Sequence, residues 1–400
     1  MSSIDYEIDL LSKLVEVDTV SATKEGYDLC AFMVAEEAKK ASLKVEILDG
    51  EKAARDGVSR PNVIVTLDSG SDTTLLLESH FDVVPPGEGW KYPPFKLTIE
   101  NGKAYGRGAA DNKSGIAAAL GAMRQLADNE DLDINIKLLA SVDEEIGGTY
   151  GINYVVSDCG VSGDAALVLD SGPERLFLGA SGIIWGKILV QGKQGHAGYP
   201  FKAKNAIEGA LQLISEFKSY RHAVEKKSSI LRAPPDSPRD RVWGRFNITM
   251  IKAGEAENII PGTCEVRFDR RLLPEEPIAK AERELITFFD SATKRSRYRA
   301  RLEITNKFSG YLTSPDLVFV RTVSRMIKKT LGTSLPMAGE LGGNDGNFFA
   351  KHNIPVVCFG PIRTGTRYHG KDEFVHLEDL RNVRDFIVNL GKVGRDEVKS

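Results

Sequence analysis

The segment TTLLLESHFDVVPP, residues 73–86, joins an apolar run to a polar cluster and a pair of prolines. Its threonine and leucine residues are typical of a buried β-strand, and Pro85 and Pro86 cannot continue a strand's hydrogen-bond ladder. His80 and Asp82 therefore lie where the strand leaves its sheet. A histidine at such a place is more often a hydrogen-bonded structural residue than a ligand. A carboxylate two residues later favours a metal site, because it can fix the tautomer of a ligating imidazole.

Strand and helix patterns alternate over the first part of the chain. Strands are predicted at residues 62–67, 73–79, 134–142 and 164–170, and an alanine-rich helix at 115–127. This alternation predicts an α/β fold with a mostly parallel, twisted sheet flanked by helices. Such sheets bind ligands outside the carboxyl ends of their strands, which is where His80 lies.

From about residue 182 the predicted order changes to β-α-β-β-α-β, the ferredoxin-like α+β unit. The pattern places Ile207, Leu211 and Ile214 on one face of its first helix, and it predicts a mobile surface loop over the polar, proline-containing residues 221–241. After about residue 312 the first style returns, with a strand and a helix that should rejoin the first sheet. We therefore expect one domain in two parts, residues 1–181 and 312–400, around an inserted domain at 182–311.

The bulk composition is that of an ordinary soluble globular protein. Of the 400 residues, 42% are apolar and 27% charged, and 53 basic against 56 acidic residues give a net charge of -3. This balance gives no field that would favour nucleic acid or an acidic membrane as a partner. We expect no membrane segment and no signal peptide. Four scattered cysteines without CxxC spacing indicate a reducing compartment, so we expect the cytoplasm: Cys30, Cys159, Cys264 and Cys358.

Further polar residues follow the ends of other predicted elements. Asp111 stands in a glycine-rich turn before the alanine-rich helix, and an N-cap would explain it. The acidic run 143–145 follows a strand and could be a solvated loop, although cations would make such a cluster favourable. Asp170 ends another strand, and His369 comes after the last one. Each residue is a weak signal alone. Two histidines and three carboxylates at five such positions together match what two closely spaced divalent metals need.

Eight stretches resemble the dinuclear-zinc metallopeptidase and deacylase family of acetylornithine deacetylase, succinyl-diaminopimelate desuccinylase, aminoacylase, glutamate carboxypeptidase and the carnosinase-like dipeptidases. They stand in family order over nearly the whole chain: SHFDVVPPGEGW, YPPF, YGRGAADNKSG, DEEIGG, GHAGYPFKAKNAI, NIIPG, GGNDGNFFAKHNIPVVCFGP and HGKDEF. The resemblance implies a catalytic domain, residues 1–181 and 312–400, split around a lid or dimerisation domain at 182–311. This division agrees with the pattern above.

The resemblance also implies metal ligands and a catalytic base. One zinc would be held by His80 and Asp170, and the other by Glu145 and His369, with Asp111 bridging the two. Asp82 would orient His80. Glu144 would be the general base that takes a proton from the water and delivers it to the leaving amine. Neighbouring residues of an extended strand point to opposite sides, so a backbone turn is expected near Gly147 and Gly148.

Further roles are implied for the inserted domain and for the glycine-rich turn after it. His196 resembles a lid histidine that stabilises the oxyanion in a partner subunit's active site, which implies a homodimer. Asn258 and Arg271 resemble residues that bind the substrate carboxylate. Gly343 and Asn344 belong to a turn whose backbone amides could do likewise. We expect Arg107 to hold the glycine-rich turn before Asp111.

Position 170 departs from the deacylase pattern. Deacylases and carboxypeptidases of the family usually carry glutamate there, whereas its aminopeptidases and dipeptidases usually carry aspartate. The turns around Asp111 and Gly343 are closer to the desuccinylase and deacetylase branch. Asn112 replaces a common methionine, which should not affect metal binding.

The expected function is hydrolysis of an N-acyl amino acid with two divalent ions, zinc first and cobalt or manganese as alternatives. The second hypothesis is a dipeptidase, aminopeptidase or carboxypeptidase of the same family, which would act on a dipeptide or a peptide end. A third hypothesis is a protein that binds a ligand in this pocket without hydrolysing it. Such a protein would not need Glu144 as a general base.

Overall fold

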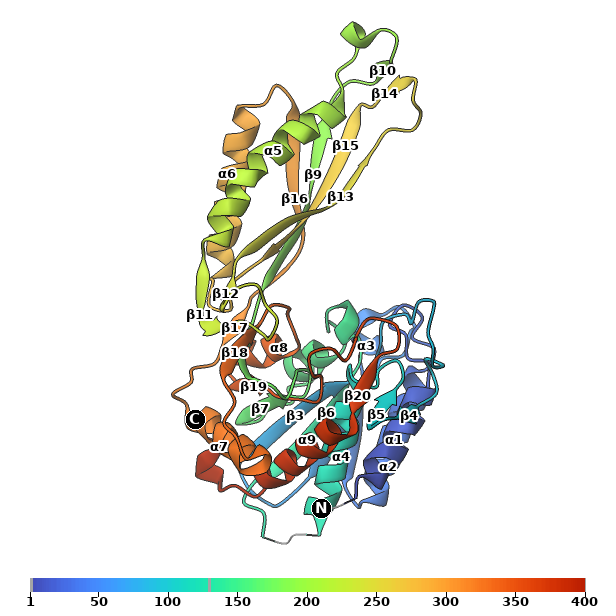
Figure 1. Ribbon diagram of the computed structural model, residues 1–400, viewed down its shortest axis with the longest axis vertical. Helices are drawn as coiled ribbons and strands as arrows, with labels where there is room; N and C mark the ends of the chain where they lie inside the picture. The colour runs from blue at the N-terminus through green and yellow to red at the C-terminus, as the bar shows by residue number, and fades with distance from the viewer. Residues whose placement is uncertain (1–2, 129–130, 400) are drawn as a thin grey trace. The chain divides into compact units, whose positions relative to one another are not determined.

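The computed structural model describes residues 3–128 and 131–399, and the chain folds as two compact units (Figure 1). Unit 1 holds residues 1–178, 313–338 and 344–400, and unit 2 holds residues 179–312 and 339–343. Residues 339–343 join unit 2 although they lie outside the range expected for the inserted domain. Among the described residues, no helix has the length and apolar character needed to cross a membrane.

The large sheet of unit 1 runs in the order β1-β2-β6-β3-β7-β19-β8. Its central strands β6, β3, β7 and β19 are parallel to one another, as predicted, whereas β1, β2 and β8 pair antiparallel with their neighbours. No helix separates β2 from β3, and β2 pairs with β6 instead of with β3. The strands are β1 Lys44–Asp49, β2 Pro61–Leu67, β3 Thr74–His80, β6 Asn135–Ser141, β7 Ala165–Val168, β8 Leu176–Ala180, β17 Tyr311–Leu312, β18 Met337–Glu340 and β19 Val356–Cys358.

Helices flank this sheet and bury its apolar strands. Leu75, Leu76 and Leu77 of β3 have no exposed surface, as expected for a strand covered on both faces. The alanine-rich α4 packs on β3 and β6 and also contacts α1 and α9, while α8 packs on β7 and β19. The helices are α1 Asp5–Glu16, α2 Tyr27–Lys40, α3 Glu51–Ala54, α4 Lys113–Ala127, α7 Val318–Leu331, α8 Gly346–Lys351 and α9 Leu377–Leu390, and a small sheet contains β4 Thr98–Glu100, β5 Lys103–Tyr105 and β20 Phe374–His376.

Unit 2 is built on an antiparallel sheet of order β13-β15-β9-β16, with α5 and α6 on one face (Figure 1). In chain order these elements give β-α-β-β-α-β, so the predicted ferredoxin-like unit is present. The elements are β9 Ile183–Gln191, β10 Gly195–His196, α5 Ala206–Glu225, β11 Ser228–Arg232, β12 Arg241–Trp243, β13 Arg245–Ala253, β14 Ile259–Ile260, β15 Thr263–Arg271, α6 Ile278–Lys294 and β16 Arg299–Phe308.

Two local predictions for unit 2 were wrong. Residues 221–241 are not one surface loop, because α5 continues to Glu225 and β11 then pairs antiparallel with β12. Proline stands only in the connection between these two strands, where no ladder hydrogen bond is needed. The predicted apolar face of α5 was wrong at Leu211, which is 59% exposed, whereas Ile214 packs against the core. The core contains the next stripe round the helix: Leu213, Phe217, Tyr220 and Val224.

Candidate active site

Five side chains from separate parts of unit 1 form two groups that could each hold a metal ion. One group is His80, Asp111 and Asp170, and the other is Asp111, Glu145 and His369. Within each group, one ligand atom per residue lies within 4.8 Å of the others. They come from the end of β3, the turn before α4, the residues after β7, the turn after β6 and the loop after β19. Asp111 belongs to both groups, so the fold places two ligand sets side by side.

The contacts within these groups suit cations better than hydrogen bonds alone. Nε2 of His80 is buried and lies 3.1 Å from Oδ1 of Asp111, yet it makes no hydrogen bond. Nε2 of His369 lies 3.2 Å from Oδ2 of Asp111 and 3.0 Å from Oε2 of Glu145. Oε1 of Glu145 is buried without a partner. Unpartnered buried nitrogen and oxygen atoms aimed at one another are the donor set that a divalent metal such as zinc takes, so the residues fit such ions.

The charges of the groups are strongly coupled. Burial lowers the pKa of His80, but Asp111, Asp82 and Glu144 outweigh this effect and hold the pKa well above its ordinary value. Hydrogen bonds to Asp111 and Glu145 raise the pKa of His369 to about 10. Burial and the charge of Asp111 raise the pKa of Asp170 well above its usual range. The carboxylates thus attract positive charge, which protons supply when no metal ion is bound.

Asp82 connects His80 to the acidic turn. Nδ1 of His80 lies 3.1 Å from the carbonyl oxygen of Asp82 and 3.5 Å from its Oδ1. The Asp82 carboxylate accepts hydrogen bonds from the backbone N–H groups of Glu144 and Glu145, each at 3.1 Å. The nearer acceptor for the ring is therefore the backbone carbonyl, while the carboxylate holds the turn.

The turn that separates the roles of Glu144 and Glu145 begins earlier than predicted. Asp143 already has a left-handed backbone with φ +61°, and a short 3₁₀ turn covers Glu144–Ile146 before Gly147. Tyr27 and Arg60 each donate to the Asp143 carboxylate at 2.9 Å and fix it.

Glu144 lies within the electrostatic reach of both ligand groups. Burial raises the pKa of Glu144 well above its ordinary value, His80 opposes this rise, and the charges of Asp170 and Asp345 add to it. A carboxylate with a raised pKa is a good proton acceptor near neutral pH.

Arg107 and Glu373 stabilise the segments that carry Asp111 and His369. The sequence analysis did not predict this role of Glu373. They form an ion pair with at most 1% of either side chain exposed. Oε1 of Glu373 accepts from the backbone N–H groups of Ala110 at 2.9 Å and Asp111 at 3.0 Å. Nη2 of Arg107 donates to the Gly370 carbonyl at 2.9 Å, next to His369. The pair therefore ties the Asp111 turn to the His369 loop. Its only sequence signal was that Glu373 stands inside the HGKDEF match.

The predicted residues of unit 2 fall at two places in that unit. His196 in β10 pairs with Ile259 in β14, and the Asn258 carbonyl accepts from Ala197 N–H at 2.9 Å, so His196 and Asn258 are neighbours. Arg271 ends β15, far along the strand from that pair.

Gly343 and Asn344 stand where the chain passes from unit 2 to unit 1. The Asn344 amide is engaged within unit 1, where Nδ2 contacts Sγ of Cys358 at 3.4 Å and Oδ1 accepts from Gly346 N–H.

The chain matches peptidase family M20/M25/M40 over residues 76–392. A succinyl-diaminopimelate desuccinylase from Nautilia profundicola is 29% identical over 388 residues, which cover 94% of this chain and 96% of that protein.

Among solved structures, an M20 family metallo-carboxypeptidase from Sulfolobus solfataricus superposes with a TM-score of 0.78 at 21% identity, covering 97% of this chain and 99% of that one. Aminopeptidase PepT from Bacillus cereus gives a TM-score of 0.77 at 20% identity, covering 99% of both chains. These likenesses confirm the predicted fold class. The chain belongs to peptidase family M20/M25/M40 and is a metal-dependent hydrolase of amide or peptide bonds.

Proposed function

We propose that the chain hydrolyses the amide bond of N-acyl amino acids. The observation that carries this proposal is the pair of ligand groups that share Asp111, with the buried Glu144 beside them. His80 and Asp170 would hold one ion, Glu145 and His369 the other, and Asp111 both, with zinc expected and cobalt or manganese as alternatives. When bound, such ions supply Lewis-acid polarisation of the substrate carbonyl.

The residues of the chain supply the proton transfers. Glu144 takes a proton from the attacking water as the C–O bond forms, and it returns the proton to the amine nitrogen as the C–N bond breaks. Asp82 holds the Glu144 backbone amide and so keeps the carboxylate in place. The products are a free carboxylate and a free amine.

The second candidate is a dipeptidase, aminopeptidase or carboxypeptidase of the same family. Aspartate at position 170 favours its aminopeptidase and dipeptidase branches, because the resemblance associates glutamate at that ligand with deacylases and carboxypeptidases. The relative named as a desuccinylase, aligned over 94% of the chain, supports the N-acyl amino acid instead.

We infer a homodimer, because the residues of unit 2 proposed to act on one substrate lie toward opposite ends of one strand. Asn258 and His196 lie beyond the Thr263 end of β15, whereas Arg271 is its last residue. Eight residue steps of β-strand span roughly 26 Å, so one chain cannot bring His196 and Arg271 to the same small substrate. A second copy can supply His196 and Asn258. Arg271 binds the substrate carboxylate, and the backbone amides around Gly343 and Asn344 also bind it.

The four free cysteines support a cytoplasmic protein.

The deciding experiment is hydrolysis of a substrate panel by zinc- or cobalt-loaded protein, with Glu144→Gln as the blank. The panel contains N-acetyl and N-succinyl amino acids beside unblocked dipeptides with the same side chains. We expect preference for the blocked amino acids. Preference for the dipeptides would replace the first candidate by the second, and no turnover of either class would overturn both.

A further inference from the structure

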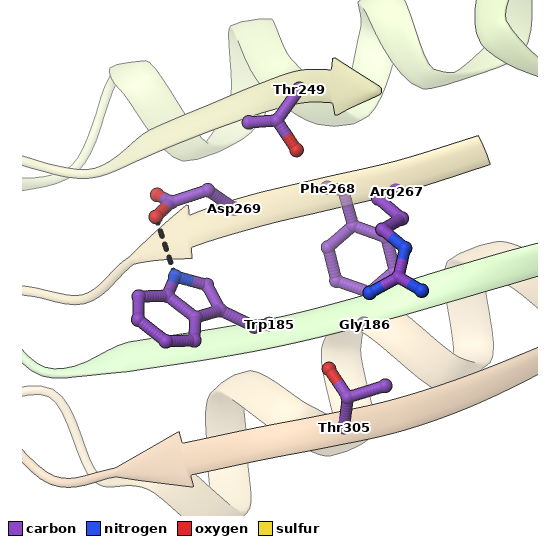
Figure 2. A pocket seen from close by; sticks show the side chains of 7 residues that line it. All are labelled: Trp185, Gly186, Thr249, Arg267, Phe268, Asp269 and Thr305. Carbon is purple, nitrogen blue, oxygen red and sulfur yellow. Dashed lines mark hydrogen bonds between the residues drawn. The ribbon is translucent and has the colours of Figure 1, made fainter. Parts of the chain in front are cut away.

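The open face of the unit 2 sheet, opposite α5 and α6, carries charged side chains beside a hollow of about 280 Å³ (Figure 2). Trp185 is 40% exposed there, and its indole N–H donates to Oδ2 of Asp269 at 2.6 Å, the dashed line in Figure 2. Asp269 also accepts from Nε of Arg271, with both carboxylate oxygens at 3.0 Å. Asp269 is therefore engaged by two donors, and it fixes the direction of the Arg271 side chain.

A second arginine faces Arg271 across the strand pair. Arg245 begins β13 and is the register partner of Arg271 in β15. Side chains directly opposite on antiparallel strands lie on the same face, with Cβ atoms about 4.5–5.5 Å apart, and like charges in this arrangement repel. Asp269 lies on the diagonal and is already paired, so one carboxylate accompanies two guanidinium groups.

The donors of both arginines are only partly used. Arg271 bonds Asp269 through Nε, and among the described residues its two Nη atoms make no hydrogen bond. Nη2 of Arg245 donates to Oγ of Ser181 at 2.8 Å and to the Leu341 carbonyl at 2.9 Å, while its buried Nε has no partner. Within residues 3–128 and 131–399, Arg245 makes no ion pair. Burial and the charge of Arg271 lower the pKa of Arg245 to about 10, although the charge of Asp269 raises it. The Arg245 guanidinium also lies over the Trp243 ring, 5.3 Å from its centroid.

We propose that Arg245 binds a second substrate carboxylate beside the one held by Arg271, so that the hydrolase acts on derivatives of acidic amino acids. The proposal rests on the proposed function, in which Arg271 binds the α-carboxylate. The side-chain carboxylate of glutamate or aspartate lies a few bonds from the α-carboxylate, which matches two neighbouring guanidinium groups. An amide at the same place cannot supply the missing negative charge.

The test compares N-acetylglutamate with N-acetylglutamine, which differ by one charge and hardly in shape. We expect the metal-loaded parent to show kcat/KM about 10-fold to 100-fold higher for the glutamate derivative. Arg245→Gln should abolish that ratio and leave the glutamine derivative little changed, whereas Arg245→Lys should keep part of it. Arg271→Gln should weaken both substrates. The control is Arg267→Gln, which removes a charge from the same sheet face, where Arg267 pairs with Glu265, and it should keep the ratio.

Other outcomes separate the hypotheses. A parent with no preference, or an Arg245→Gln variant with the parental ratio, overturns the proposal. An equal loss on both substrates in Arg245→Gln also overturns it, because Arg245 would then only tether Leu341 or share one carboxylate with Arg271. If no panel member is hydrolysed, the proposed function fails. The inference is then decided by calorimetry, which gives the ratio of the affinities of the metal-loaded variants for N-acetylglutamate and N-acetylglutamine.

Discussion

Replacing Arg107 by methionine tests whether the buried ion pair behind the site holds the metal ligands in place. Methionine fills similar space but removes the charge, the contact with Glu373 and the hydrogen bond to the Gly370 carbonyl. Both partners of the pair are buried, with Glu373 at 0% and Arg107 at 1% exposure. The substitution therefore affects both the stability of the fold and the position of His369.

The magnitude follows from the burial of the pair. Removing one partner of a buried ion pair costs about 3–5 kcal/mol, because the other charge stays buried and unpaired. The cost should depend on pH. Burial and the charge of Asp111 already raise the pKa of Glu373 to about 7 in the parent, although Arg107 lowers it. Without Arg107 this pKa rises further, so the variant holds the proton to higher pH than the parent does. The loss of stability should therefore grow as pH rises above about 7 and be smaller at pH 6.

Two measurements check this expectation. Urea unfolding of the metal-free proteins at pH 6 and pH 8 gives the difference in unfolding free energy. Competition with a metal chelator gives the affinity for zinc, which should fall about 10-fold to 100-fold when the support of a ligand is lost.

Arg384→Met is the matched control. Arg384 is also 1% exposed and pairs with the buried Glu7 at 3.2 Å and with Asp385 at 2.7 Å. It also donates to the Ser3 carbonyl, and none of these partners is a candidate ligand. It should lose stability and keep its zinc affinity. The reasoning is refuted if Arg107→Met unfolds within about 1 kcal/mol of the parent at pH 8, or if both variants lose zinc equally.

Three further predictions concern the site itself. Glu144→Gln should keep its metal content, measured by elemental analysis, and lose about 10²-fold to 10⁴-fold in kcat; a metal-poor variant would instead make Glu144 a ligand. His196→Ala and Glu144→Gln should each be nearly inactive alone, yet their mixture should regain turnover, because a mixed dimer has one site with both residues; without such rescue, His196 does not act between subunits. Zinc loading at pH 7 should release a proton from His369, whose metal-free pKa of about 10 lies above the usual 6.5, so affinity should rise with pH up to about 10. Calorimetry in buffers of different ionisation enthalpy counts these protons, and a count of zero would contradict the assigned charge state.

The parts of the fold that the sequence predicted are those set by local pattern. The apolar composition of β3 and of the alanine-rich α4 predicts that both elements are buried. Both are buried in the structure. A predicted strand also gives the position of its end. The positions of His80 and Asp170 at the ends of strands could therefore be predicted too. The antiparallel edge strands could not, since pairing partners are chosen by tertiary packing. The face of α5 was misread because Leu211 and Leu213 both suit a helical stripe, and only the packed sheet selects Leu213.

Supporting contacts were harder to predict because they join distant parts of the chain. Glu373 holds the backbone of Asp111 across 262 residues, and no local pattern records that pairing. The turn at Asp143 was expected at the glycines because glycine is the usual left-handed residue. Asp143 adopts this conformation while Tyr27 and Arg60 hold its carboxylate, and these partners lie 116 and 83 residues away.

The geometry of unit 2 links the two proposals made for it. If His196 and Arg271 act on the same substrate, as proposed, a second copy must complete the site, because β15 separates the His196 end from the Arg271 end by more than the length of a small substrate. The same strand presents Arg271 opposite Arg245, where like charges repel. Two substrate carboxylates, one bound to each arginine, would offset the repulsion. Substrate binding should therefore stabilise unit 2 as well as fill the site, and an acidic substrate should do so more than its neutral analogue.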